Sequence, residues 1–125
     1  MNGPADVRVE LRGLSAFGPH GVTPAEREVG CRIVLDISFT VPASAAVVSD
    51  ELGDTVDYGA VAQLAAAIVT ERSCHTLERL CGLIAEEIGA RFDVAGIEVR
   101  AAKPEPPIPE TIGEVAVTLR RDGAG

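Results

Sequence analysis

Apolar and polar residues alternate along four stretches of this chain, as they do in β-strands with one buried face. The stretches cover residues 7–12, 33–41, 97–102 and 114–120. The third continues to Lys103, which has the same parity as the apolar residues before it. We therefore predict four strands, and the first two, which follow one another through a loop, should pair antiparallel.

Between the second and third strands, apolar residues recur at helical spacing in two segments. The first helix is expected to begin after Asp57, an N-cap residue, and the second after Thr76. Gly89 lies inside the second pattern and should weaken its last turns. The apolar positions that define the two helices are Val61, Leu64, Ala65, Ile68 and Val69, then Leu77, Leu80, Cys81, Ile84 and Ile88.

The element order strand, strand, helix, helix, strand, strand predicts an α+β fold, an antiparallel four-stranded sheet with both helices on one face. Residues 13–30 are expected to form a loop and residues 45–48 a short helical turn. The length fits a single domain, residues 1–125, with a core over about residues 6–121. Since a sheet covered on one side leaves its edges open, the sheets of neighbouring subunits could join edge to edge.

Composition and charge narrow the range of partners. The formal net charge of −8 argues against nucleic acid or an anionic membrane surface. The longest apolar run is too short to cross a bilayer, and the first 13 residues contain no signal-peptide core, so we expect a cytoplasmic protein. Hydrophobic residues make up 46% but aromatic residues only 3%, so the core should be aliphatic, and a subunit interface could cover part of the apolar surface.

The sequence predicts no metal or cofactor site. Cys31, Cys74 and Cys81 are odd in number and show no CxxC spacing, which argues against a disulfide framework and against zinc. A Ser-His-Asp order and a phosphate-binding glycine loop are also missing from the sequence. Cys81 lies on an apolar helix face and is expected to be a small core residue.

Lys103 is the first candidate for chemistry. Its place at the end of the third strand, on the parity of Val99 and Ala101, should direct its ammonium group to the buried side. Prolines follow it closely, and they end the strand and stiffen the next loop. The side chain could simply extend to water along its aliphatic stem, or it could be a partly desolvated lysine suited to proton transfer.

Four further residues are candidates, each with a structural alternative. Glu78 falls in the first turn of the second helix, where a carboxylate either stabilises the helix dipole or points into a pocket. Tyr58, the only tyrosine, could be an amphipathic filler or a proton donor. Glu26 lies in a predicted loop and could be solvated, and His20, beside a glycine, could be a base or a structural residue.

Four motifs in register resemble those of the dihydroneopterin aldolase family, in the same order and spacing over residues 7–121. They are His20-Gly21-Val22 with Glu26 and Gly30, Asp54-Thr55-Val56-Asp57-Tyr58, Leu77-Glu78 at a helix start, and Lys103-Pro104 before Pro107-Ile108-Pro109. The chain departs from the common family pattern at Cys31, where glutamine often follows the glycine, and at Pro19 before the histidine.

The resemblance implies the tunnelling fold, in which subunits join their sheets into a ring of four and two rings stack into an octamer. It implies a retro-aldol cleavage of 7,8-dihydroneopterin into 6-hydroxymethyl-7,8-dihydropterin and glycolaldehyde, a step in folate biosynthesis. The conjugated C=N bond of the pterin accepts the electrons, so neither a Schiff base, a metal nor another cofactor is required. Members of the family also epimerise the side chain at C2′.

The resemblance also implies a role for each site residue. Lys103 would be the general acid/base, and Tyr58 of a neighbouring subunit would contact the substrate and reprotonate the intermediate. Glu78 would accept hydrogen bonds from the ring N–H and the amine of the pterin. The backbone N–H of Leu77 would meet the pterin carbonyl, and Glu26 would hold the hydroxylated side chain or a catalytic water.

Two alternatives stay open at this point. A dihydroneopterin-triphosphate 2′-epimerase would share the fold and similar residues, but it must bind a triphosphate, and a chain of net charge −8 shows no basic cluster for one. A non-catalytic domain that assembles through its sheet edges would share the fold without the chemistry.

Overall fold

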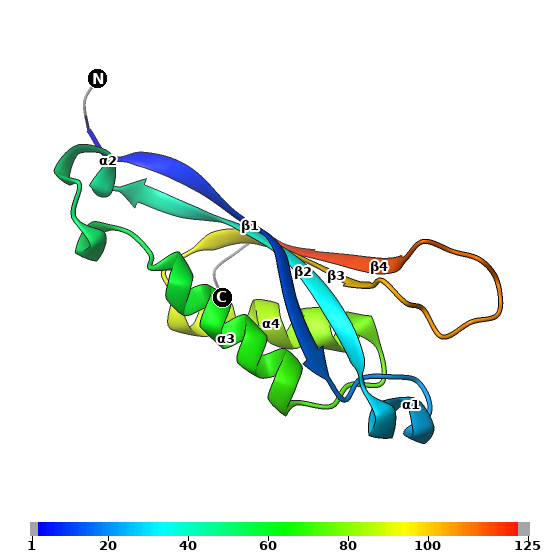
Figure 1. Ribbon diagram of the computed structural model, residues 1–125. Helices are drawn as coiled ribbons and strands as arrows, with labels where there is room; N and C mark the ends of the chain where they lie inside the picture. The colour runs from blue at the N-terminus through cyan, green and yellow to red at the C-terminus, as the bar shows by residue number, and fades with distance from the viewer. Residues whose placement is uncertain (1–2, 123–125) are drawn as a thin grey trace.

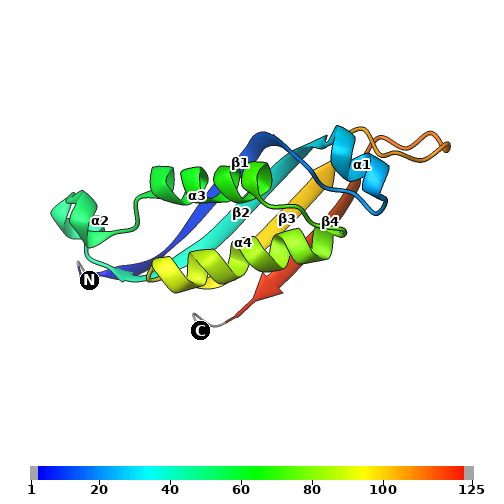
Figure 2. The same cartoon turned by 90° about the horizontal axis from the view of Figure 1, so that it is seen from below.

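The computed structural model of the chain describes residues 3–122. They form a four-stranded antiparallel sheet in the order β1-β2-β3-β4, and helices α3 and α4 cover one of its faces (Figures 1 and 2). The elements are β1 (Ala5–Gly18), α1 (Pro24–Val29), β2 (Cys31–Ser44), α2 (Ala46–Ser49), η1 (Leu52–Asp54), α3 (Tyr58–Glu71), α4 (Leu77–Arg91), β3 (Ala95–Lys103) and β4 (Val115–Arg121). The predicted α+β fold, with both long helices on one face, is confirmed.

The first strand is longer than predicted because a β-bulge interrupts its alternation. The pairing of β1 with β2 shifts register between Leu11 and Leu14, and Gly13 between them has a φ of +76°. The bulge adds one residue, so Leu14 and Ala16 return to the face that packs against the core. The prediction of a loop over residues 13–30 is therefore wrong for its first part, which belongs to β1.

Helix α1 is a second difference in the same stretch. Thr23 caps this helix, and its hydroxyl accepts a hydrogen bond from the backbone N–H of Glu26 at 3.2 Å. Pro24 follows in the first turn, where an N–H would have no intrahelical partner. The helix has only six residues, none of them fully buried, so it leaves no apolar periodicity in the sequence.

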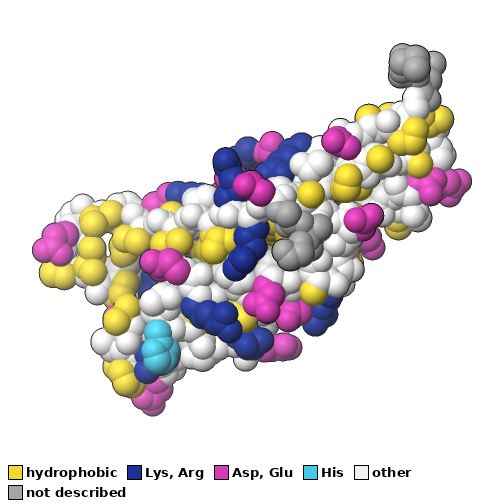
Figure 3. Space-filling model, turned by 180° about the vertical axis from the view of Figure 1, so that it is seen from behind, with side chains coloured by type: hydrophobic (Ala, Val, Ile, Leu, Met, Phe, Trp, Pro, Cys, Tyr) yellow, Lys and Arg dark blue, Asp and Glu magenta, His cyan; other side chains and the backbone are white. Residues whose placement is uncertain are grey.

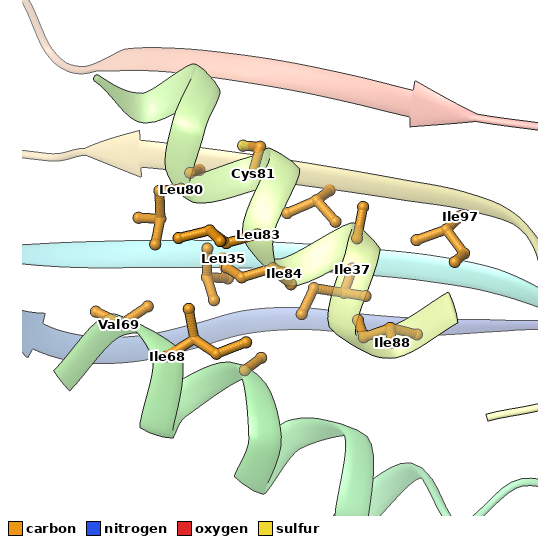
Figure 4. Packing of buried hydrophobic residues seen from close by; sticks show 14 of the residues in the cluster. Leu35, Ile37, Ile68, Val69, Leu80, Cys81, Leu83, Ile84, Ile88 and Ile97 are labelled. Atoms are coloured by element: carbon orange, nitrogen blue, oxygen red, sulfur yellow. The ribbon is translucent and has the colours of Figure 1, made fainter. Parts of the chain in front are cut away.

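The core lies between the sheet and the two long helices (Figure 4). Alternate residues of β2 and β3 are buried on the helix side, with the parity that the sequence predicts. They are Ile33, Leu35, Ile37, Phe39, Val41, Ile97, Val99 and Ala101. Helix α3 packs over β1, and helix α4 packs over β3 and β4. Phe39 is the only aromatic among the buried hydrophobic residues of the described chain, so the core is aliphatic as predicted.

The two long helices begin where the capping residues predict. The Asp57 carboxylate accepts hydrogen bonds from two backbone N–H groups of the first turn of α3, at 3.0 and 3.4 Å. The Thr76 hydroxyl accepts one from the N–H of Arg79 at 3.1 Å. Helix α4 continues through Gly89 to its end, because its buried face is broader than the predicted stripe. The additional buried residues of α4 are Gly82, Leu83 and Ala85.

Different elements occupy the two ends of the molecule. Helices α2 and η1, which include the helical turn predicted near residues 45–48, lie at one end; α1 and the segment joining β3 to β4 lie at the other (Figures 1 and 2). Apolar side chains are exposed along the arm that carries α2 (Figure 3). The exposed large hydrophobic residues are Val47, Val48, Leu52 and Tyr58 toward this end, and Phe17, Val22, Val29, Ile108, Ile112 and Val115 toward the other.

The sheet face opposite the helices is polar. Arg120 forms an ion pair with Glu98 at 2.7 Å, and Arg100 pairs with Glu114. Within residues 3–122 we find no helix that is both long enough and apolar enough to cross a membrane. The same part of the chain contains no group of three or more His, Cys, Asp or Glu side chains placed to hold a metal ion.

Candidate active site

Lys103 is the last residue of β3 and is paired with Val115 of β4. Its half-buried side chain lines two adjoining cavities, which we call the α4 lobe and the α1 lobe after the nearest helix. The α4 lobe has a volume of about 380 Å³ and the α1 lobe about 320 Å³. Glu26 and Pro107 also line both cavities. The lysine therefore lies at the junction of the two lobes, next to a carboxylate.

The α4 lobe is built around the start of helix α4, whose first two residues are Leu77 and Glu78. The N–H groups in the first turn of a helix have no intrahelical partner, so those of Leu77 and Glu78 can donate to a ligand. The remaining lining residues are mostly apolar: Val22, Glu26, His75, Thr76, Lys103, Pro106, Pro107, Ile108, Val115 and Val117. An apolar slot with a carboxylate and N–H donors at one end suits a flat heterocycle with donors and an acceptor on one edge.

The α1 lobe is smaller and, like the α4 lobe, has two glutamates and one lysine among its lining residues. Its lining residues are His20, Ala25, Glu26, Val29, Gly30, Cys31, Lys103, Glu105 and Pro107. Burial raises the pKa of the Cys31 thiol; the charge of Lys103 opposes this shift, and those of Glu26 and Glu105 add to it. The thiol is therefore protonated at neutral pH, and the formal charges in the lobe belong to two carboxylates and one ammonium group.

Glu26 is fixed by the turn that leads into α1. Its Oε2 atom accepts a hydrogen bond from the backbone N–H of Val22 at 2.9 Å, and its own N–H is bound by the Thr23 cap. Gly21 allows this close approach, because a Cβ at that position would lie 2.4 Å from the Cβ of Glu26. The carboxylate is therefore held at the boundary of the lobes, although the sequence pattern gives it a solvated loop position.

His20 is buried, with 2% of its surface exposed, and both of its ring nitrogens are occupied. Nε2 donates to the carbonyl oxygen of Val69 at 2.6 Å, and Nδ1 accepts from the backbone N–H of Cys74 at 3.1 Å. Burial lowers the pKa of His20; the bond to Val69 opposes this shift, and the charge of Lys103 adds to it. A neutral ring with no free nitrogen cannot serve as the base, so the structural interpretation of His20 is the one that fits.

The backbone around His20 joins the two sides of the site. The hydroxyl of Ser73 donates to the carbonyl oxygen of Pro19 at 2.7 Å. The N–H of Gly21 donates to the carbonyl oxygen of Cys74 at 3.0 Å. These bonds tie the segment that precedes α1 to the loop that precedes α4. Glu26 and Glu78, which follow these two segments, are therefore held relative to each other through one small network.

Tyr58 lies far from both lobes. It is the first residue of α3, whereas Val69, near the other end of that helix, contacts His20 beside the α1 lobe. At about 1.5 Å per residue, the helix separates the two positions by roughly 17 Å. The Tyr58 side chain is 63% exposed and lines neither cavity. A single subunit therefore brings together the lysine and the glutamates but not the tyrosine.

Known proteins resemble this chain in both sequence and fold. The sequence model of the family described as dihydroneopterin aldolase matches residues 9–120. The chain belongs to the dihydroneopterin aldolase family. A dihydroneopterin aldolase of Streptomyces coelicolor is 39% identical over 114 residues, which cover 91% of this chain and 96% of that relative. The predicted enzyme class, an aldehyde-lyase of folate biosynthesis, is confirmed at the level of this family.

Two solved structures place the fold among dihydroneopterin aldolases. A protein of Vibrio cholerae assigned to this activity superposes with a TM-score of 0.85 at 28% identity, covering 93% of this chain and 97% of its own. A Burkholderia dihydroneopterin aldolase, crystallised with guanine, superposes with a TM-score of 0.78 at 28% identity, covering 94% and 91%. The subunit therefore has the tunnelling fold of the family.

The sequence pattern did not point to several residues that line the lobes of this dihydroneopterin aldolase fold. Val29 lies on the short helix that the pattern hides, and Glu105 follows Lys103 in the proline-containing segment. The sequence predicts only strand positions for Val115 and Val117, although both also line the α4 lobe. One signal was available for Glu105, because a residue two positions after a site lysine must lie near the same strand end.

Proposed function

We propose that this chain cleaves the C1′–C2′ bond of 7,8-dihydroneopterin, giving 6-hydroxymethyl-7,8-dihydropterin and glycolaldehyde. The observation that carries the proposal is the position of Lys103 between a lobe suited to a flat heterocycle and a lobe that shares Glu26. A substrate with its bicyclic ring in the α4 lobe would extend its side chain past the lysine toward the α1 lobe. The bond to be broken would then lie next to the amine.

The pterin ring would be bound by the start of α4. The Glu78 carboxylate would accept hydrogen bonds from the ring N–H and the 2-amino group, and the Leu77 N–H would donate to the carbonyl oxygen. Guanine presents the same edge, with an amine, a ring N–H and a carbonyl group in a row. A related aldolase that binds guanine supports this recognition mode for a chain of the same fold.

Lys103 would move the proton that drives the cleavage. As the C2′ hydroxyl loses its proton, directly or through a water, the C1′–C2′ bond breaks and C2′ becomes the aldehyde carbon of glycolaldehyde. The electron pair passes from C1′ into the conjugated C=N bond of the pterin, so no covalent bond to the lysine is needed. Glu26 would hold the side-chain hydroxyls or the water in place.

Tyr58 of a neighbouring subunit would protonate C1′ and complete the reaction. Its exposure, together with the exposed Val47, Val48 and Leu52 at the same end of the molecule, supports an intersubunit role. Strands β1 and β4 are the open edges of the sheet, where copies can pair. Contact between unlike ends closes into a ring when the rotation permits it, so we propose a ring of subunits, stacked in pairs.

A side activity follows from the same intermediate. If glycolaldehyde rotates before it leaves, the C1′–C2′ bond can re-form with the opposite configuration at C2′, and the enzyme then acts as an epimerase.

A cytoplasmic location stays a prediction from the sequence.

The deciding experiment incubates the purified protein with 7,8-dihydroneopterin and measures glycolaldehyde and the hydroxymethyl pterin in equal amounts. Products at background level would refute the proposal and leave a non-catalytic domain. Conversion of dihydroneopterin triphosphate to its 2′-epimer, without cleavage of the free compound, would instead identify the triphosphate epimerase.

A further inference from the structure

Acidic residues outnumber basic ones along the α1 lobe, the cavity that would receive the substrate side chain. Among its described lining residues, Glu26 and Glu105 are acidic and Lys103 is basic. The other titratable residues there are neutral at pH 7, since burial raises the pKa of Cys31 and lowers that of His20. The lobe therefore carries a net formal charge of about −1 before any ligand enters.

Arg32 lies outside the lobe and offsets only part of its acidic charge. Its Nη2 atom lies 3.5 Å from Oε2 of Glu105, and the two side chains are 49% and 70% exposed, so water screens this ion pair strongly. Arg27 of α1 donates hydrogen bonds to the carbonyl oxygens of Gly21 and Val22, at 2.9 and 3.0 Å, and lines neither lobe. Lys103 is the single cation among the described residues that line the lobe, and the proposed reaction requires it.

A neighbouring subunit would make the site more acidic. The segment that leads to Tyr58 carries Asp50, Glu51, Asp54 and Asp57, and residues 49–58 contain no Lys or Arg. If Tyr58 reaches the site from a second copy, these carboxylates approach with it. They would then add negative charge near the completed site.

We propose that Glu105, oriented by its ion pair with Arg32, is a specificity-determining residue that excludes side chains ending in phosphate. The inference rests on the proposed function, because it assumes that the side chain of the pterin enters the α1 lobe. A neutral triol can be accommodated by hydrogen bonds to carboxylates, whereas a phosphate would bring two or more negative charges toward Glu26 and Glu105. Glu105 thus makes the site discriminate between dihydroneopterin and its phosphate esters.

The test compares kcat/KM for 7,8-dihydroneopterin with that for its 3′-triphosphate, counting cleavage and epimerisation together. The variants are Glu105→Gln, Glu105→Lys and Arg32→Gln. Glu110→Gln is the matched control, because it removes the same charge from the same segment at an exposed residue that lines neither lobe. The quantity compared is the ratio of the two kcat/KM values.

We expect the wild-type ratio to favour the free compound strongly. Glu105→Gln should raise relative turnover of the triphosphate by about fivefold and Glu105→Lys by more, because one charge change acts on several phosphate charges at short range. Arg32→Gln should shift the ratio the other way, and Glu110→Gln should leave it unchanged. The effects should shrink at about 0.5 M salt, where the screening length falls to a few ångströms.

Equal turnover of both compounds by the wild type, or a ratio that Glu105 variants do not change more than Glu110→Gln does, would overturn the inference. Neither result would contradict the proposed function, provided that the protein still cleaves free dihydroneopterin. Loss of that cleavage in the wild type would refute the proposed function by itself.

Discussion

The Nε2 atom of His20 lies 2.6 Å from the carbonyl oxygen of Val69, and the opposite ring nitrogen accepts the backbone N–H of Cys74. These two bonds require a neutral imidazole protonated at Nε2. A second proton on Nδ1 would remove the acceptor for Cys74 and place a buried charge near Lys103. Only the neutral His20 ring therefore stabilises the connection between α3, the loop that precedes α4 and the turn before α1.

The first prediction concerns the pH dependence of stability. Because the pKa of His20 is lowered in the folded state from its usual 6.5, the unfolded chain binds more protons between the folded pKa and pH 6.5. The contribution of His20 to the free energy of unfolding should be complete above pH 6.5 and fall as the pH decreases through that window. Urea unfolding from about pH 5 to pH 8 measures this slope.

His20→Gln is the comparison for this measurement, since an amide can donate to Val69 but does not titrate. The variant should be less stable at pH 7, and the difference in stability from the wild type should narrow toward low pH. A difference that is constant or grows on acidification would contradict the assignment of a neutral ring.

A second prediction concerns Lys103. Lys103→Ala should lower kcat by about 10²- to 10⁴-fold, as expected when a general acid/base is removed, and should change the Kd of the product pterin much less. Lys103→Arg separates charge from proton transfer, because a guanidinium stays protonated at neutral pH. Near-normal turnover in either variant would remove the lysine from the mechanism.

A third prediction tests the absence of a Schiff base. Lys103 is the only lysine in the sequence, as 10 of the 11 basic residues are arginine. Borohydride added during turnover should leave the mass of the protein unchanged, because the electron sink is the pterin ring. A reduced adduct mapped to the peptide that contains Lys103 would establish covalent catalysis instead.

The anchoring role of Glu78 gives a fourth prediction. Glu78→Ala should weaken pterin binding by about 10- to 100-fold, the usual range for losing hydrogen bonds to a charged group. Glu86→Ala removes an exposed carboxylate from the same helix and should bind the pterin as the wild type does. Calorimetric titration with the product measures both, and an equal Kd for the two variants would refute the anchor.

A fifth prediction addresses the subunit that supplies Tyr58. Tyr58→Phe and Lys103→Ala subunits should each be nearly inactive, and mixing them at equal ratio with dissociation and reassembly should restore about a quarter of the sites. Rescue is expected because one subunit supplies the lysine and the other the tyrosine. A mixture no more active than its components would place Tyr58 outside the site.

Strand and helix positions were predictable where one apolar face is buried without interruption. Over residues 33–41 of β2 and 97–101 of β3 the alternation is complete, so parity alone puts Lys103 on the helix side. In β1 the alternation fails at Gly13, because the bulge adds a residue that pairwise periodicity cannot represent. Helix α1 was missed because a short, half-exposed helix leaves no periodic signal.

The site was predictable to different depths. Glu78 follows from a capping residue at a helix start, whereas the motif resemblance indicates Leu77 and Glu26. The hydrogen bond of Glu26 to Val22 depends on a turn that periodicity does not reveal. The environment of Glu105 depends on how a proline-containing segment returns to β4, which is a tertiary property. Tyr58 could be connected to the lysine only through a second copy of the chain.

The placement of Lys103 at the end of β3 also limits the insertions and deletions that this strand can accept. Side chains along a strand point alternately to opposite faces, so inserting or deleting one residue after Val99 would turn the amine toward the ion-paired face, where Arg100 and Glu98 now lie. Such a chain could keep its core while losing the proposed chemistry. If Lys103 acts as proposed, the spacing of this strand is as much a functional constraint as the lysine itself.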